Sequence, residues 1–509
     1  MPQLSRAATA LEYRRMSGHS QDNLRDRRML LWKRILPAAL LSMLLLAPCF
    51  WHTHIQAGDL GSHVYNAWLA QLAERGEVPG LYTVWQYQNV LFDLMLSVIG
   101  KAFGFAAGEK IAVGLCVLLF FWSVFALIRS ATGNSPWRFV PAVAMLAYGY
   151  VFHMGFFNYY LSIALACLGL ALVWNFRARN VLLALVLVPL MVLAHPMGLL
   201  FFLSISAYLF LWRKVPQLRW PLPLASICAA GGVHWFFLRH QGYEVGWPDR
   251  PFYFYSGADQ LAVFGERYQW FVLAAVVLGV LMIAVSMRRM IRERELRSER
   301  VFLLHLFVMA FVAIVLLPDN LIINPAHGWI GLVVSRLTVI TAILGLCFLA
   351  SLPAHWWVAP AFTACALVFF GFLYQDTGFV DRMENNAASL VHGLPPGTRV
   401  LKTVYAPDNW RVRFIYHSID RACIGHCFAY SNYEAATSQF RVRARAGNRF
   451  AVTDAETSEV MESGDYEVQE EDLPMKEIYQ CDAADLAKLR MRDLVAGEEN
   501  GRIGYRPER

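Results

Sequence analysis

Long apolar runs recur along the first three quarters of the chain, and short polar segments separate them. Most runs hold roughly 16 to 22 residues, which at 1.5 Å per residue can cross about 30 Å of hydrocarbon with some tilt or shortening. The run 89–105 is apolar but short, and Asp93 and Lys101 interrupt it. We expect eleven membrane-spanning helices, at residues 35–51, 110–129, 137–152, 156–175, 180–195, 198–212, 221–238, 269–287, 301–317, 329–350 and 356–374.

The composition agrees with a polytopic membrane protein. Of the 509 residues, 57% are hydrophobic and 16% are charged, and the mean hydropathy is +0.40, so a soluble domain could not bury the apolar surface. The net charge of +7 comes from basic loops, and no basic stripe with interleaved aromatic residues indicates a nucleic-acid partner. Residues 1–34 are arginine-rich and show no signal-peptide cleavage site, which predicts a cytoplasmic N-terminal tail before a retained first helix.

The basic loops decide how the run 89–105 is placed. If this run does not cross the membrane, every basic loop falls on the side of the N-terminus, as the positive-inside rule requires. These loops are 129–138, 176–180, 213–219 and 288–300. The external side then receives the loops rich in His, Asn, Asp and aromatic residues, at 52–109, 153–159, 194–198, 239–268 and 318–329. We therefore expect a multi-pass protein of the cytoplasmic (inner) membrane.

Residues 375–509 have the composition of an ordinary soluble domain, which the topology places outside the cytoplasm. The pattern predicts a helix at 381–392, a turn and strand at 394–405 and a helix at 483–494, so we expect a small α/β domain. Three cysteines lie in this part, Cys423, Cys427 and Cys481, and the sequence leaves open which two form a disulfide. A zinc site built from the same cysteines is the alternative.

Candidate chemistry concentrates in the first external loop, 52–109, where we expect amphipathic juxtamembrane helices. Asp59 precedes a helical pattern whose apolar positions Leu60, Val64, Trp68 and Leu72 predict a helix along the membrane surface. Asp59 and His63 are four residues apart and share a helix face. The side chain of Asp59 is either an N-cap or a carboxylate at the boundary of water and lipid, where desolvation makes it a stronger base.

A metal site is a second hypothesis for the same loop. Imidazole and carboxylate groups are suitable ligands for divalent ions, so His52, His54, Asp59 and His63 could hold one. Histidines at a membrane interface without a ligand role are the simpler interpretation.

Over residues 35 to about 215 the chain resembles the GT-C superfamily of glycosyltransferases, which includes protein O-mannosyltransferases and lipid A aminoarabinose transferases. The resemblance lies in a first crossing, a loop acid on a juxtamembrane helix, the stretch GEVPGLY, an apolar stretch ending in FG, and the pair Glu109 and Lys110 that opens the next crossing. It implies that residues 35–374 form a GT-C-like transmembrane domain. Such enzymes take a sugar from a polyprenyl-phosphate carrier on the external side of the membrane.

The resemblance also implies site residues. The role of base or metal-linked acid falls on Asp59, and His153, Asn158 and His195 lie in loops that would line the cavity. Many members carry two adjacent acids and a Pro-Pro-Leu stretch, whereas this chain has one acid and QNVLFDL. His63 or Asp93 would then take over part of the reaction centre.

Inverting transfer also needs cations that stabilise the departing phosphate. Arg336 is the best candidate, because an arginine inside an apolar span is costly to bury and suggests a function. Arg250, in the long external loop, is a further candidate.

We therefore interpret the chain as a membrane glycosyltransferase. Its partners would be a lipid-linked sugar donor, membrane lipids and a glycan, lipid or protein acceptor. A lipid-linked-glycan transporter, a polysaccharide polymerase or ligase, and a non-catalytic membrane scaffold are the alternatives. A transporter should place ionisable residues deep in several helices, and here most of them lie in loops.

Overall fold

The computed structural model describes residues 35–239, 244–247, 251–293, 298–322, 329–412, 414–415, 417–437, 439–482, 485 and 487–504. It contains two compact units, Met1–Pro48 and Cys49–Arg509. The described part of the first unit belongs to the apolar helix Ile35–Phe50. All contacts below lie within the second unit.

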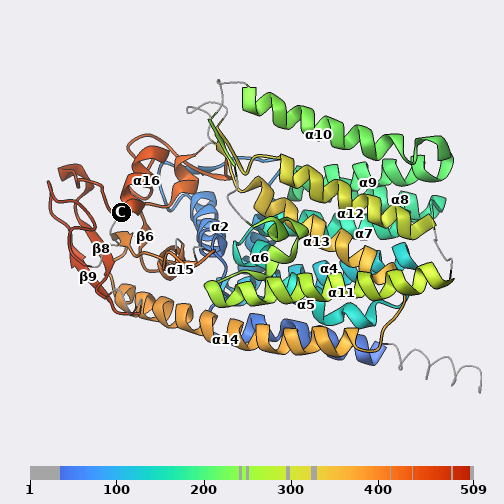
Figure 1. The fold of residues 1–509 in the computed structure, drawn as a ribbon. Helices are drawn as coiled ribbons and strands as arrows, with labels where there is room; N and C mark the ends of the chain where they lie inside the picture. Colours follow the sequence, from blue (N-terminus) through green and yellow to red (C-terminus); the bar gives the residue numbers. More distant parts are fainter. Residues whose placement is uncertain are drawn as a thin grey trace, which may run out of the picture. The chain divides into compact units, whose positions relative to one another are not determined.

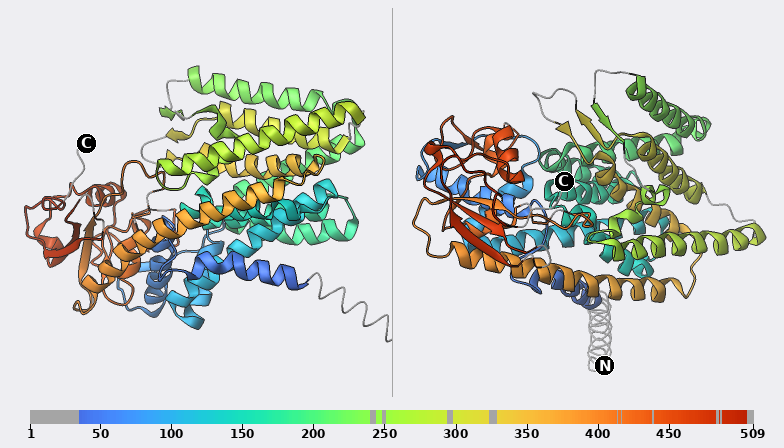
Figure 2. Two further views of the ribbon diagram at one scale, coloured as in Figure 1. Left: turned by 60° about the horizontal axis from the view of Figure 1, so that its bottom comes forward. Right: turned by 60° about the vertical axis from the view of Figure 1, so that its left-hand side comes forward.

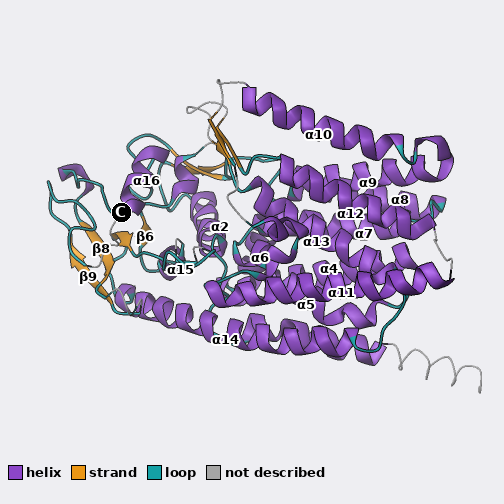
Figure 3. Ribbon diagram, viewed as in Figure 1, coloured by secondary structure: helices purple, strands orange, loops and turns teal. Residues whose placement is uncertain are grey.

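Helices make up most of the described chain (Figures 1 and 3). After Ile35–Phe50 they are α2 Leu60–Arg75, α3 Leu91–Phe103, α4 Phe105–Thr132, α5 Val140–Ala147, α6 Tyr150–His153, α7 Phe157–Val173, α8 Ala178–Ala194, α9 Pro196–Lys214, α10 Pro221–Arg239, α11 Gln269–Glu293, α12 Ser298–Leu316, α13 Val333–Ser351, α14 Val358–Val391, α15 Ser418–Ala422 and α16 Ala455–Ser463. Short 3-10 helices lie at Pro136–Phe139, Pro216–Leu218, Phe252–Ser256, Ala258–Leu261, Glu266–Tyr268, Tyr433–Ala436 and Glu470–Asp472.

Seven of the described helices, rather than the eleven expected, are long and apolar enough to cross a membrane: α4, α9, α10, α11, α12, α13 and α14. The helices Ile35–Phe50, α7 and α8 are apolar but shorter. These helices agree with a multi-pass membrane protein. With 13 residues, α3 is about 20 Å long and does not reach across the hydrocarbon.

Two predicted spans differ from the observed helices. Residues 137–152 do not form one helix, because the backbone at Gly149 is extended between α5 and α6. A side chain at this position would approach the carbonyl oxygen of Gln260 to 2.8 Å, so the chain comes close to a neighbouring segment here. The other difference is α14, one helix of 34 residues that contains both the predicted span 356–374 and most of the predicted helix 381–392.

The loops at the two ends of the helices form two separate sets of contacts. At one end Arg138 donates hydrogen bonds to the carbonyl oxygens of Ala350 and Leu352, at 2.9 and 3.0 Å, and Arg300 donates to Ser351. At the other end the first loop bonds to residue 153 and to Leu193, whose carbonyl accepts from Val90 at 2.9 Å. Loops predicted to share a side of the membrane are thus in contact with one another.

The C-terminal segment contains a four-stranded sheet of order β6-β5-β8-β9. The strands are β5 Arg399–Thr403, β6 Phe428–Ala429, β8 Met475–Gln480 and β9 Leu489–Asp493; β5 runs parallel to β6 and β8, and β9 runs antiparallel to β8. The strand expected within 394–405 is confirmed by β5. The helix expected at 483–494 is wrong over 489–493, where Leu489 and Met491 alternate toward the core as strand residues do; residues 483, 484 and 486 lie outside the described part.

Two further small sheets involve the loops. β1 Leu81–Thr83 pairs antiparallel with β7 Val442–Ala444 and joins the first loop to the C-terminal segment. β2 Glu244–Gly246, β3 Asn320–Ile322 and β4 Trp329–Ile330 form the other sheet.

The helix α2 does not lie along a membrane surface as expected. Of its 16 residues 11 are buried, and Tyr65, Leu69 and Ala70 share a hydrophobic core with residues 419–435 of the C-terminal segment. In Figures 1 and 2 the blue α2 lies beside the orange and red C-terminal segment. The approach is close, because a side chain at Gly61 would lie 2.0 Å from the carbonyl oxygen of His417. The amphipathic helix of this loop is α3, which buries Phe92 and Leu96 and exposes Phe103.

Candidate active site

The segment 153–159, between α6 and α7, gathers most of the predicted site residues. The carbonyl oxygens of His153 and Met154 accept hydrogen bonds from the backbone N–H groups of Gly58 and Asp59, at 2.7 and 3.0 Å. Gly155 permits this contact, because it has a φ of +83° and a side chain there would lie 2.5 Å from the backbone nitrogen of Asp59. The first loop therefore docks on the start of α7.

Asn158, in the first turn of α7, binds Asp93 of the first loop. Its side-chain Nδ2 donates to Asp93 Oδ2 at 2.9 Å, and its Oδ1 accepts from the backbone N–H of Phe92 at 2.8 Å. His63, on α2, contacts the other oxygen of the same carboxylate, with 2.7 Å between Nδ1 and Asp93 Oδ1. The sequence-predicted residues His63, Asp93 and Asn158 are thus in direct contact.

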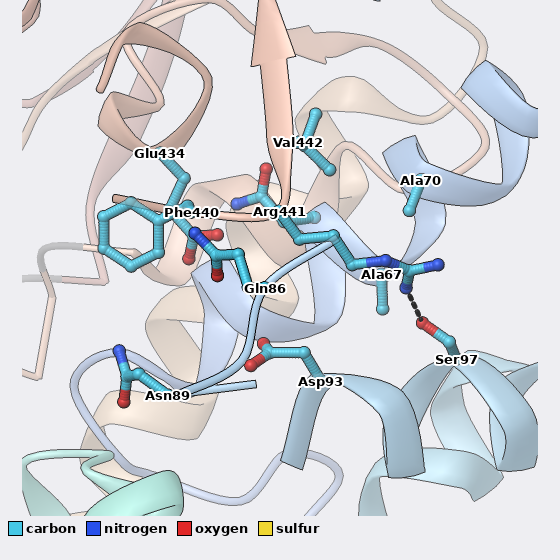
Figure 4. A pocket seen from close by; sticks show the side chains of 11 residues that line it. Ala67, Ala70, Gln86, Asn89, Asp93, Ser97, Glu434, Phe440, Arg441 and Val442 are labelled. Atoms are coloured by element: carbon cyan, nitrogen blue, oxygen red, sulfur yellow. Dashed lines mark hydrogen bonds between the residues drawn. The ribbon is translucent and has the colours of Figure 1, made fainter. Parts of the chain in front are cut away.

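Glu434 completes this group from the C-terminal segment. It lies in the 3-10 helix Tyr433–Ala436, is buried, and accepts a hydrogen bond from Ser62 Oγ at 2.8 Å. Both Glu434 and Asp93 line one narrow pocket between α2, α3 and the C-terminal segment (Figure 4). We call His63, Asp93, Asn158 and Glu434 the Asp93 cluster.

The rest of the pocket is lined by polar and apolar side chains from both the first loop and the C-terminal segment. They are those of Asn66, Ala67, Ala70, Gln86, Asn89, Ser97, Phe440, Arg441 and Val442. Arg441 donates to Ser97 Oγ at 2.9 Å, as drawn in Figure 4, and pairs with Glu74 at 2.7 Å. Gln86 donates to the carbonyl oxygen of Gln439 at 2.5 Å. First loop and C-terminal segment are therefore both needed to form the pocket.

The electrostatics of the cluster hold its members in different protonation states. Burial lowers the pKa of His63, but the carboxylates of Asp93, Glu434 and Asp59 outweigh it and raise the pKa to about 9. Burial raises the pKa of Glu434 to about 7, with a further rise from Asp93 and an opposing effect of His63. At neutral pH His63 is a cation, and Glu434 exchanges its proton.

Asp59 is at the N-cap position of α2, but among the described residues its side chain forms no capping hydrogen bond. It is partly exposed and does not line the pocket of Figure 4. Its charge acts on its neighbours, because it contributes to the raised pKa values of His63 and of Tyr433. The N-cap interpretation of Asp59 is therefore not supported by a bond.

Arg336 lies in the first turn of α13 and contacts the same segment 153–159. Its guanidinium carbon is 4.2 Å from the centre of the Phe156 ring, and its backbone carbonyl accepts a hydrogen bond from the Tyr159 hydroxyl at 2.9 Å. No carboxylate of the described residues forms an ion pair with it. Arg336 and Asp59 thus contact neighbouring residues at one end of the helices.

His195 is close to Arg336. Its ring lies 5.4 Å from that of Tyr159, and its Nδ1 accepts a hydrogen bond from the backbone N–H of Met197 at the start of α9. Burial and, to a smaller extent, the charge of Arg336 lower the pKa of His195 to about 4. His195 is a neutral helix cap beside the arginine.

The other predicted residues have structural partners. Nδ1 of His153 lies 2.8 Å from the carbonyl oxygen of Gln56, and burial lowers the pKa of this histidine to about 4. His52 contacts the carbonyl oxygen of Tyr374 at 2.9 Å, and His54 contacts Asp381 at 3.1 Å. Arg250 lies outside the described residues.

The histidines of the first loop do not converge on one point. His52 and His54 turn toward α14, whereas His63 turns toward α3. Among the residues that the structure describes, no group of three or more His, Cys, Asp or Glu side chains could hold a metal ion. Cys423 and Cys427 form a disulfide, and Cys481 is free, so these cysteines do not form the alternative zinc site.

A chain of polar side chains continues from the Asp93 cluster into the C-terminal segment. Ser62 accepts from Asn432 Nδ2 at 3.1 Å, and Asn432 also donates to Asp420 Oδ2 at 3.0 Å. Asp420 in turn binds Lys402 at 3.2 Å. All of these side chains are buried, so the polar network is shielded from water between α2 and the sheet.

A second ionic group, which we call the Arg421 cluster, joins Arg421 to His54, Glu109, Asp381 and Glu384. Arg421 binds Glu109 at 2.6 Å and also binds Glu384. His54 lies 3.3 Å from Glu384. The cluster fastens the C-terminal segment to α4 and α14.

Glu434 and Arg421 were not predicted from the sequence as functional residues. Glu434 is separated from Ser62 by 372 positions, and Arg421 from Glu109 by 312. A pattern within a short window cannot indicate such pairs.

No known protein family, curated protein or solved structure matches this chain.

Proposed function

We propose that the protein is a membrane glycosyltransferase that moves a sugar from a polyprenyl-phosphate donor to an acceptor on the external face of the cytoplasmic membrane. The proposal is carried by the contacts that residues 153–159 make. They are in contact with first-loop acids on one side and with Arg336 on the other. A sugar phosphate transfer needs both kinds of group within the length of one substrate.

Arg336 is suited to hold the phosphate of the donor. It lies at the end of an apolar helix, where a polyprenyl chain can remain in the lipid while its phosphate reaches the guanidinium. Neither the aromatic ring of Phe156 nor the neutral His195 carries a negative charge that would bind Arg336 in place of the phosphate.

Three carboxyl groups surround the other half of the proposed site: Asp59, Asp93 and Glu434. The acceptor hydroxyl must lose its proton to one carboxylate, and the anomeric carbon gains positive charge as the phosphate departs. Carboxylates around the reacting carbon stabilise that charge.

The GT-C-like architecture, with about eleven crossings, the N-terminus in the cytoplasm and residues 375–509 outside, is part of this proposal.

The experiment compares Asp59→Asn, Arg336→Glu and wild type in membranes supplied with radiolabelled undecaprenyl-phosphate glucose, mannose, arabinose and aminoarabinose. We expect wild type to transfer one of these sugars to material of its own membranes. Asp59→Asn should reduce the transfer at least 10-fold, and Arg336→Glu should raise the apparent KM for the donor. Arg382→Glu is the control for charge reversal, because Arg382 is exposed on α14. Full transfer by Asp59→Asn and an unchanged KM in Arg336→Glu would contradict the assignment.

A lipid-linked-glycan transporter is the second candidate. The buried side chains of Ser62, Asn432, Asp420 and Lys402 form an unbroken series of hydrogen bonds. Transporters use such series of polar and ionisable groups as proton relays. This series lies between α2 and the C-terminal sheet, outside the long apolar helices, which favours the transferase.

A further inference from the structure

We propose that Glu434 is the catalytic base of the sugar transfer and takes the proton of the acceptor hydroxyl in the pocket that it shares with Asp93. This inference rests on the proposed function. It assigns the base to the C-terminal segment instead of to Asp59 in the first loop.

Asp93 is not available for this role. Both of its carboxylate oxygens are occupied, Oδ1 by His63 at 2.7 Å and Oδ2 by Asn158 at 2.9 Å. A proton placed on either oxygen would displace a donor that is itself buried. Asp93 is therefore held in place by two partners, and its carboxylate helps to raise the pKa of His63.

Asp59 is less suited than Glu434 for a different reason. It is partly exposed and does not line the pocket, so it is not placed to meet an acceptor bound beside Glu434. The charge of Asp59 still reaches His63 and Tyr433. We assign to it the electrostatic stabilisation of the reacting centre.

Glu434 has the geometry of a base. Its side chain is 4% exposed, and Ser62 provides the one hydrogen bond that the carboxyl group receives from the described residues, at Oε1. Oε2 remains for a ligand in the pocket. In Figure 4 the side chain of Gln86 lies between the carboxyl groups of Glu434 and Asp93, which line the same pocket. An acceptor hydroxyl bound beside Gln86 would lie next to Glu434.

The charges around Glu434 tune it for proton transfer. His63 comes from α2, Asp93 from α3, and His417 and Arg441 from the C-terminal segment. Burial together with Asp93 raises the pKa of Glu434 to about 7, while the two histidines oppose the rise. A buried carboxyl group whose pKa lies near the working pH is typical of a general base.

During sugar transfer the O–H bond of the acceptor breaks, and its proton passes to Oε2 of Glu434. The acceptor oxygen forms a bond to the anomeric carbon of the donor sugar, while the bond from that carbon to the phosphate oxygen breaks. The bonding electrons leave with the polyprenyl phosphate next to Arg336, and Glu434 later returns its proton to water through the pocket.

The experiment uses the full chain in membranes and the panel of radiolabelled undecaprenyl-phosphate sugars. In wild type the transfer should increase as the pH rises through about 7, because Glu434 acts only when ionised. Glu434→Gln keeps the acceptor oxygen for Ser62 and should lower the rate at least 100-fold with unchanged binding of undecaprenyl phosphate. Glu456→Gln is the matched control, because Glu456 is an exposed glutamate of α16 in the same segment, and it should leave the rate unchanged.

The pH profile of Asp59→Asn separates the two candidate bases. If Asp59→Asn keeps the increase near pH 7 at a lower rate, Glu434 is the base. If the increase disappears in Asp59→Asn and persists in Glu434→Gln, our inference is overturned while the proposed function stands.

A spectroscopic measurement does not depend on turnover. The infrared band of a protonated carboxylic acid should be present in wild type at pH 6, lost at pH 8.5, and absent from Glu434→Gln. A band that is identical in both proteins overturns the inference even if no sugar is transferred. If wild type shows the band but transfers no sugar, the proposed function fails and the base assignment fails with it.

Discussion

The Asp93 cluster and the Arg421 cluster are both buried, both ionic and both join the first loop to the C-terminal segment, but they are paired differently. In the Arg421 cluster each carboxylate has a cationic or imidazole partner: Glu109 and Glu384 bind Arg421, and Asp381 binds His54. In the Asp93 cluster the carboxyl group of Glu434 has one donor among the described residues, the neutral Ser62, and it faces a pocket.

This difference separates a structural role from a chemical one. A buried ion pair with every group satisfied fixes the relative position of two segments, and removing one member leaves a buried charge uncompensated. A buried carboxyl with a free oxygen at a pocket can bind and exchange protons with a ligand. The Arg421 cluster therefore holds the segment that delivers Glu434 to the first loop.

The largest effect on stability should come from Arg421→Met. It leaves Glu109 and Glu384 buried without their cation, so we expect a loss of about 3–5 kcal/mol in the free energy of unfolding. Tryptophan fluorescence during urea unfolding in detergent measures the change. Arg75→Met is the control, because Arg75 is 61% exposed and forms only a loose pair with Glu77. A loss below about 1 kcal/mol would mean that the cluster does not fasten the two segments.

Asp93→Asn should have the next largest effect, and this effect depends on pH. Burial lowers the pKa of His63, but Asp93, with smaller contributions from Glu434 and Asp59, raises it from 6.5 to about 9, so the stabilisation is present in full below pH 6.5 and is lost as the pH rises through about 9. The gap in unfolding free energy between wild type and Asp93→Asn should therefore be on the order of 3 kcal/mol larger at pH 6 than at pH 10. A gap that does not change with pH would show that His63 is neutral in the folded protein.

Gly155→Ala tests the docking of the first loop on α7. The new Cβ would lie 2.5 Å from the backbone nitrogen of Asp59, so we expect a loss of about 1–3 kcal/mol beyond that of Gly76→Ala. Gly76 is a matched control, because it also has a positive φ, +74°, and no atom lies within 4 Å of an added Cβ. Equal losses in the two variants would mean that the backbone contact at Asp59 is loose.

The smallest effect should be that of Asp59→Ala on stability. Since Asp59 forms no capping bond, the free energy of unfolding should change by less than about 0.5 kcal/mol. Asp454→Ala provides the comparison, because Asp454 caps α16 by accepting from the backbone N–H of Thr457 at 2.7 Å, and its loss should cost about 1 kcal/mol. A loss of similar size in both variants would identify Asp59 as a cap and weaken its role at the site.

The sequence predicted the helical membrane class for a physical reason, and it named several first-loop residues that lie close together. Apolar runs report burial in lipid or protein directly, so most expected spans coincide with helices, such as α4 and α12. His63 and Asp93 were named because the chain departs from the two-acid pattern of the GT-C superfamily, and Asn158 because it lies in a loop that would line the cavity. Their contact could not be inferred, since it depends on how α2, α3 and α7 pack.

Other features depend on contacts between distant segments. The burial of α2 requires the C-terminal segment, whose Ile419 and Phe428 cover it, and the hydrophobic positions of α2 alone resemble those of a surface helix. The strand β9 was read as a helix because five residues carry little periodicity until β8 pairs with them. Glu434 lies in a polar stretch of sequence that differs little from its surroundings. Only its position beside Ser62 and Asp93 in the folded chain distinguishes it from other polar residues.

The most direct measurement is photo-crosslinking of the full chain in membranes with undecaprenyl phosphate that carries a photoreactive group at its phosphate end, followed by mass spectrometry of the labelled peptides. Our account predicts labels on residues 153–159 and at the start of α13, and their loss in Arg336→Glu but not in Arg382→Glu. Labels confined to the opposite end of the helices, around residues 350–352, or labels unchanged in Arg336→Glu, would contradict it.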